Sequence, residues 1–173
     1  MSADKKTFLK WWIGGILIFA VSIFIHGPLA TAEVPGGILD HQAARNAAEV
    51  DAIQFYWAAD NLIGRARMAM ISDLVFIVIY GIGAFLGGRY FYRNSNTLLR
   101  SIGAAIAVAG LVFLATDLVE TSLQLVQLMQ FAGDDTLASI ASNMGPTKVA
   151  TFLFSFFGLL ALLVTEWFSS RAA

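Results

Sequence analysis

The sequence predicts an all-α fold, an integral membrane four-helix bundle with a short amphipathic extramembrane helix between spans 1 and 2. The chain has 173 residues, of which 58% are hydrophobic and 13% charged, whereas soluble domains carry about 25% charged residues. Its mean hydropathy is +0.72. Four mainly apolar runs have about the 20 residues or more that a membrane-crossing helix needs, at residues 11–29, 68–88, 98–123 and 149–168. The length suits one transmembrane domain over residues 1–173.

The composition also restricts the chemistry that we expect. Cysteine is absent, which excludes disulfides, thiolate metal sites and dithiol redox chemistry. The net charge of −1 gives no reason to expect a nucleic-acid partner. The two histidines show no paired metal or haem spacing, so we expect no cofactor and no metal. A haem held by His26 alone is the one such arrangement left open.

The first apolar run permits two interpretations. Residues 11–29 can form a retained membrane anchor. Residues 5–32 also resemble a signal peptide, because a basic start and an apolar stretch precede the small residues Ala30-Thr31-Ala32. Cleavage there would leave three spans with unchanged orientation.

Basic residues predict how the spans are oriented in the membrane. One side carries seven of them, namely Lys5, Lys6, Lys10, Arg89, Arg93, Arg100 and Arg171. The other side carries four, namely Arg45, Arg65, Arg67 and Lys148. The excess predicts a multi-pass protein of a bacterial inner membrane with both termini in the cytoplasm. An aromatic belt is expected at the cytoplasmic boundary, formed by Trp11, Trp12, Tyr90, Tyr92 and Trp167.

Residues 31–66 form the outer segment. Val34-Pro-Gly-Gly37 predicts a turn, followed by one helix from Gly37 or Asp40 to about Ala59, with Asp40 as a suitable N-cap. An apolar stripe recurs at helical spacing, at Ala43, Ala47, Val50, Ile53 (or Gln54) and Trp57. Such a helix could cover the outer mouth of the bundle, lie flat in the headgroup layer or simply connect two spans.

Two carboxylates interrupt the third span, at Asp117 and Glu120. A charged side chain in hydrocarbon costs a few kcal/mol or more, so such residues face a protein interior or a water-filled cavity. Gln124 and Gln127 continue the same helical face. Gln124 could be a further member of a polar cluster with these acids, but the position of both glutamines favours the exit of this span into water. Asp73 lies at the corresponding depth of span 2.

These polar residues come from different helix ends at one depth, so we expect them to converge on an outer-leaflet acidic pocket. The predicted binding residues are Asp73, Tyr80, Asp117, Glu120, Lys148, Arg65, Arg67 and His26. Arg65 or Arg67 is expected at the rim of this pocket. Two acids at i and i+3 repel when both are ionised, so one should hold a proton or a cation.

Small residues predict close helix packing in the inner halves of the spans. They occur as Gly83-x-x-x-Gly87, Gly103-x-x-x-Ala107 and Gly14-Gly15. The phenylalanines of span 4 are better explained by lipid contact and core packing than by a cofactor pocket.

Three motifs together resemble a known family. They are Asp73-x-x-Phe76-x-x-x-Tyr80 in span 2, Asp117-x-x-Glu120 in span 3 and Lys148 opening span 4. The chain is similar in these residues to a functionally uncharacterised family of small bacterial four-span inner-membrane proteins. That family has asparagine after the glutamate, where this chain has Thr121. The resemblance covers spans 2 to 4 and implies a fold and a set of polar positions, but no activity.

Three functions remain open on this reasoning. The first is a non-catalytic membrane protein that binds a small cation, a proton or an amphiphile such as a lipid or quinone, or acts as an accessory subunit of a larger complex. The second is a lipid- or isoprenoid-modifying enzyme using Asp117 or Glu120 as acid and base. The third is a purely structural ion-pair network. Membrane lipid is the expected partner, with a homo-oligomer or a larger membrane complex also possible.

Overall fold

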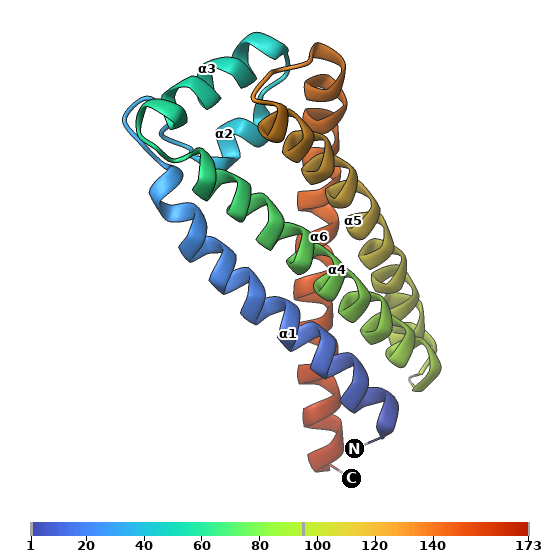
Figure 1. The fold of residues 1–173 in the computed structure, drawn as a ribbon. Helices are drawn as coiled ribbons and strands as arrows, with labels where there is room; N and C mark the ends of the chain where they lie inside the picture. The colour runs from blue at the N-terminus through green and yellow to red at the C-terminus, as the bar shows by residue number, and fades with distance from the viewer. Residues whose placement is uncertain (1, 95, 173) are drawn as a thin grey trace. The chain divides into compact units, whose positions relative to one another are not determined.

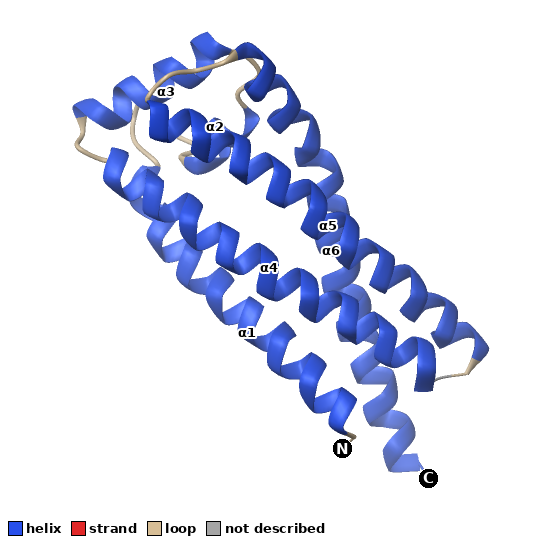
Figure 2. Cartoon of the chain, turned by 45° about the vertical axis from the view of Figure 1, so that its right-hand side comes forward, coloured by secondary structure: helices blue, strands red, loops and turns tan. Residues whose placement is uncertain are grey.

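The computed structural model describes residues 2–94 and 96–172, and every regular element in these ranges is helical. The elements are α1 (Ala3–His26), the 3₁₀ turn η1 (Gly27–Leu29), α2 (Ile38–Ala43), α3 (Ala47–Ala59), α4 (Ile63–Asn94), α5 (Thr97–Gln130) and α6 (Asp135–Ala172) (Figure 1). Figure 2 shows only helices and connecting loops in the described part. The predicted all-α class is confirmed.

Four helices are long and apolar enough to cross a membrane. The candidate spans are Ala3–Leu29, Ile63–Arg93, Thr97–Gln130 and Asp135–Ser169. They contain the four apolar runs seen in the sequence and extend beyond them. Large apolar side chains face outward, including Phe24 at 83% exposure and Leu17 at 63%. Such surfaces suit lipid rather than water, so the chain is a multi-pass membrane protein.

The chain divides into two compact units, each built from part of every long helix. Unit 1 comprises Met1–Ile16, Val78–Ala115 and Thr147–Ala173. Unit 2 comprises Leu17–Ile77 and Thr116–Pro146, and includes α2 and α3.

Helix α4 packs closely against α1 and α5 in unit 1, because glycines at these contacts leave room for the neighbouring backbone. A Cβ on Gly83 would lie 2.5 Å from the backbone nitrogen of Trp12, and one on Gly15 would lie 2.7 Å from the Cα of Tyr80. Between α4 and α5, a Cβ on Gly103 would lie 2.8 Å from the carbonyl oxygen of Gly88. These contacts confirm the predicted small-residue packing. Gly14 has only an ordinary contact, 3.7 Å from Ile79.

The aromatic residues of unit 1 divide between surface and core. Trp11 is 36% exposed, whereas Trp12 is 4% exposed and its ring packs 5.8 Å from that of Phe156. The prediction that Trp12 belongs to an interfacial belt is therefore wrong. Successive residues of a helix with 3.6 residues per turn point about 100° apart. Only one of the two tryptophans can therefore face outward.

The beginning of α1 and the end of α6 belong to unit 1 and lie at the same end of it (Figures 1 and 2). Glu166 of α6 joins three helices there. Lys5 Nζ lies 2.5 Å from its Oε2, and the Tyr90 hydroxyl donates to its Oε1 at 2.7 Å. The side chain of Arg171, used above to predict orientation, lies outside the described residues.

In unit 2, the outer segment forms two helices rather than the single helix predicted. The break falls at residues 44–46, and Asn46 caps α3 by accepting a hydrogen bond from the Glu49 amide at 2.9 Å. Glu49 in turn accepts from the Arg45 amide at 2.8 Å. This reciprocal capping starts a new helix at Ala47. Asp40 is not an N-cap, because α2 follows Gly37 at φ 57° and Asp40 accepts from the Gly36 amide.

Helices α2 and α3 form a cap packed on the rest of unit 2. Trp57 is fully buried, and its indole N–H donates to the Leu29 carbonyl at 3.0 Å. Its cluster includes Met70 of α4 and Leu128 of α5. Gln54, rather than Ile53, occupies the central buried position of α3. The predicted stripe is thus confirmed at Val50 and Trp57, while Ala43 is exposed and Ala44 takes its place.

His41 of α2 lies inside this cap. It is 1% exposed, and its ring stacks on Trp57 with centroids 5.4 Å apart. Burial lowers the pKa of His41 to about 4, because a charged imidazolium loses its hydration there. At neutral pH the cap therefore contains a neutral imidazole.

This burial predicts a pH-dependent cap. In the opened cap His41 has a pKa of about 6.5, so the open state binds more protons once the pH falls below that value. Stability is complete above about pH 6.5 and is lost progressively down to about pH 4, by at most on the order of 3 kcal/mol. Hydrogen exchange over residues 38–59, measured across this range, should show the increased opening.

The two histidines of the chain supply a matched comparison for this measurement. His41→Gln should flatten the pH dependence of cap opening, while His26→Gln should retain it. Equal pH dependence in the wild type and His41→Gln would contradict the assignment.

Candidate functional site

The buried polar side chains of the described residues gather in unit 2. They are Ser22, His41, Gln54, Asp73, Asp117, Glu120, Thr121, Gln124 and Gln127. Unit 1 contributes Ser155. A polar group removed from water is costly unless it finds a partner, so this concentration makes unit 2 the candidate site.

Helix α5 carries a continuous buried polar stripe. Its members are Asp117, Glu120, Thr121, Gln124 and Gln127, spaced at three and four residues. Glu120 and Thr121 are fully buried, and Asp117 is 6% exposed. The Thr121 hydroxyl donates to Asp117 Oδ1 at 3.3 Å. Thr121 therefore positions one carboxylate.

The C-terminal end of this stripe, at Gln124 and Gln127, is buried within the protein. Gln124 is 2% and Gln127 0% exposed, so the prediction that they mark an exit into water is wrong. Gln124 Nε2 donates to the Gln42 carbonyl of α2 at 3.3 Å, and Gln127 Oε1 accepts from the Asp134 amide at 2.9 Å. The cap and the α5–α6 connection cover these amides. The sequence could not show this, because those covering contacts are distant along the chain.

Asp73 of α4 forms a second polar contact, with α1. His26 Nε2 lies 3.1 Å from Asp73 Oδ1, although the ring N–H is not aligned with that oxygen as a hydrogen bond requires. One turn earlier on α1, the Ser22 and Ser72 hydroxyls lie 3.1 Å apart. The predicted site residues His26 and Asp73 are therefore brought together. Convergence of Asp73 with the acids of α5 stays a prediction.

Glu120 lies beside α6, where a glycine leaves it room. A Cβ on Gly145 would lie 3.9 Å from Glu120 Oε2.

The two arginines considered for the rim of the pocket, Arg65 and Arg67, differ in their surroundings. Arg67 donates to the Leu128 carbonyl from two nitrogens, at 3.4 and 3.3 Å, whereas Arg65 is exposed. Arg67 thus joins α4 to the backbone of α5.

Tyr80 and Lys148 belong to unit 1. The Tyr80 hydroxyl lies 2.9 Å from Ser155 Oγ and 3.3 Å from the Phe152 carbonyl oxygen. Tyr80 is fully buried and joins α4 to α6. Lys148 is half-buried on α6. Its approach to the acids of α5 stays a prediction.

Three buried residues near the cap were not among the predicted site residues. Both ring nitrogens of His41, both amide atoms of Gln54 and the amide oxygen of Gln124 have no hydrogen-bond partner among the described residues. Such groups cost about 1–3 kcal/mol each when unsatisfied, so a water or a polar ligand beside them would be favoured. Gln54 could have been found from its spacing, one turn before Trp57 on the buried face.

The chemistry of these groups suits hard ligands and hydrogen bonding. No group of three or more His, Cys, Asp or Glu side chains able to hold a metal occurs among the described residues. Carboxylate, hydroxyl and amide oxygens can take a proton or coordinate a hard cation. The imidazole and amides can donate to or accept from a neutral polar headgroup.

No protein-family model, curated protein or solved structure matches the chain.

Proposed function

We propose that this chain is a non-catalytic membrane protein that binds a proton, a small cation or the headgroup of an amphiphile such as a lipid or quinone in unit 2. One observation supports this most directly. Glu120 is fully buried and Asp117 is 6% exposed, and the two lie one turn apart on the same face of a membrane-crossing helix.

Two carboxylates so placed are sensitive to charge. Each loses hydration on burial, and the two repel when both are ionised. A proton or a cation taken up there, in addition to the partners that the acids already have, would lower the repulsion. The Thr121 hydroxyl donates a hydrogen bond to Asp117 Oδ1. This bond would hold the Asp117 carboxylate in place for such a ligand.

The cap side of unit 2 favours a neutral polar group. Gln54, His41 and the oxygen of Gln124 offer donors and acceptors that no described residue satisfies. An amphiphile headgroup entering there would supply the missing hydrogen bonds. The acids and the amides would then contact different parts of one ligand.

The flanking charges and the size of the bundle also favour a particular membrane location and particular partners for the chain. We place the protein in a bacterial inner membrane with both termini cytoplasmic, since the flanking basic residues favour that side. Membrane lipid is the immediate partner. A homo-oligomer, or an accessory role in a larger membrane complex, agrees with the small size of the bundle.

Binding in unit 2 should be visible as ligand-dependent stabilisation. A ligand at about 100 times its Kd should raise the Tm of the purified protein by on the order of 5 °C. The panel should contain monovalent and divalent cations, a short-chain quinone and phospholipids. Glu120→Gln and Asp117→Asn should each abolish the response to the ligand that stabilises the wild type.

Glu33→Gln is the matched control, because Glu33 is an exposed carboxylate of the same unit. It should keep the full response. If both α5 variants respond to every panel member as the wild type does, the binding proposal is wrong.

A structural network is the second candidate, favoured by the Asp73–His26 and Asp117–Thr121 contacts. Buried polar networks can often be replaced by apolar residues of similar volume without loss, or with a gain of about 1–4 kcal/mol. If the network is purely structural, Asp117→Leu combined with Glu120→Met should fold with an unchanged or higher Tm and an unchanged cellular phenotype. If unit 2 binds a ligand, that stable variant should lose the phenotype.

The proposed orientation can be tested with single thiols, because the natural chain has no cysteine. Asp60→Cys introduces a thiol at an exposed position just before α4, and Asn96→Cys introduces one at an exposed position just after it. A membrane-impermeant maleimide added to intact spheroplasts should label Asp60→Cys at once and Asn96→Cys only after lysis. The reverse order of labelling would show that the termini are on the outer side.

A further inference from the structure

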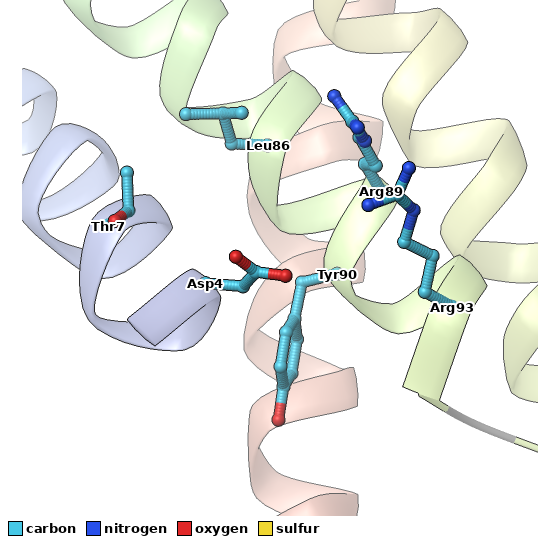
Figure 3. A pocket seen from close by; sticks show the side chains of 6 residues that line it. All are labelled: Asp4, Thr7, Leu86, Arg89, Tyr90 and Arg93. Carbon is cyan, nitrogen blue, oxygen red and sulfur yellow. The ribbon is translucent and has the colours of Figure 1, made fainter. Parts of the chain in front are cut away.

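A small cavity in unit 1 is lined by a different set of charges. Its volume is about 160 Å³, and its walls are formed by Asp4, Thr7, Leu86, Arg89, Tyr90 and Arg93. Figure 3 shows Asp4 and Thr7 on α1, with Leu86, Tyr90 and the two arginines on α4. None of these residues was used in the function proposed for unit 2, apart from the contribution of the arginines to orientation.

Several polar and charged groups of unit 1 outside this pair of arginines already have partners. Lys5 and the Tyr90 hydroxyl both bind Glu166. Arg100 donates to the Tyr92 hydroxyl at 3.1 Å, and its guanidinium lies 4.5 Å from the centre of that ring. Arg89 and Arg93, by contrast, have no ion pair or hydrogen bond to any described side chain, and both are exposed.

The two arginines lie four residues apart, on one face of α4. Like charges at this spacing repel, and Figure 3 shows both side chains extending on the same side of the helix. An anion bound between the two guanidinium groups would remove that repulsion. Guanidinium presents paired N–H donors that match the oxygens of phosphate.

The Asp4 carboxylate, the third charged group of the cavity, limits how much negative charge a bound anion can carry. Asp4 adds one negative charge to the two positive charges of Arg89 and Arg93, so the lining has a net charge of +1. A phosphodiester, with a single negative charge, balances this sum. A phosphate dianion would leave an excess and meet stronger repulsion from the Asp4 carboxylate.

The cavity also lies at one end of the second candidate span. Arg93 is the last residue of the second candidate span, and Leu86 lies two turns before it on the membrane side. A headgroup phosphate is therefore expected at the level of the arginines, with apolar surface continuing towards the acyl chains. Basic pockets between membrane helices bind lipid headgroups in this way.

We propose that the cavity formed by Asp4, Thr7, Arg89 and Arg93 binds the phosphodiester of an anionic membrane phospholipid. The arginines hold the phosphate oxygens and Asp4 limits the charge that is accepted. This site is independent of the acids in unit 2. It fixes a lipid against α1 and α4 at the basic end of the spans.

The test uses the full chain in detergent and native mass spectrometry, with phosphatidylglycerol as the probe and phosphatidylcholine as the zwitterionic reference. Phosphatidylglycerol should bind more tightly. Arg89→Gln and Arg93→Gln should each weaken its binding about fivefold, and the double variant more. Asp4→Asn should strengthen it, a gain that general loss of folding cannot produce.

Arg100→Gln is the matched control, because Arg100 is another arginine of unit 1 that does not line the cavity. It should bind phosphatidylglycerol as the wild type does. Binding unchanged in the Arg89/Arg93 double variant, or weakened equally by Arg100→Gln, overturns the proposal.

A second arm distinguishes the source of the phosphate. Inorganic phosphate and glycerol phosphate at millimolar concentration should not displace the lipid, since they lack the acyl chains that contact Leu86 and its surroundings. Displacement by either soluble phosphate would overturn the assignment to a membrane lipid.

Discussion

The cost of placing polar groups in hydrocarbon determines how this chain folds. Every backbone polar group of a membrane-crossing helix must be satisfied within the protein, and a polar side chain exposed to lipid is costly. The spans therefore expose leucine, isoleucine and phenylalanine and turn their acids, amides and hydroxyls inward. The result is uneven, because nearly all the buried polar side chains fall in unit 2, while unit 1 packs through glycine and aromatic contacts. The interior of unit 2 is therefore polar, whereas the interior of unit 1 is mainly apolar.

Helix α4 shows how the two kinds of packing share one element. Half of its most apolar window is buried, a larger share than in the other three spans. In unit 1 its glycines lie against the backbones of α1 and α5. In unit 2 the same helix presents Ser72, Asp73 and Arg67 to polar partners on α1 and α5. A single periodic sequence thus encodes close van der Waals contact over one stretch and hydrogen bonding over another.

Much of this arrangement could be predicted from the residues alone. Span positions follow from hydropathy, and the α5 stripe follows from the three- and four-residue spacing of Asp117, Glu120 and Gln124. Two kinds of feature could not be predicted. The helix break at Asn46 depends on the hydrogen bond by which Asn46 caps α3. The periodicity of apolar residues does not reveal such a cap. The burial of Gln127 and the unsatisfied atoms of His41 depend on covering contacts made by residues far apart in the chain.

The errors have a common physical origin, which also bears on function. Average preferences for depth predict that glutamines near the end of a span face water and that Trp12 lies at the interface. Both are instead held in the interior by neighbours. An amide kept from water without a partner, as at Gln54, lowers stability unless something else completes its hydrogen bonds. A fold with several such groups would gain stability from a polar ligand that completed their hydrogen bonds, and this free-energy difference is the physical basis of the binding site proposed for unit 2.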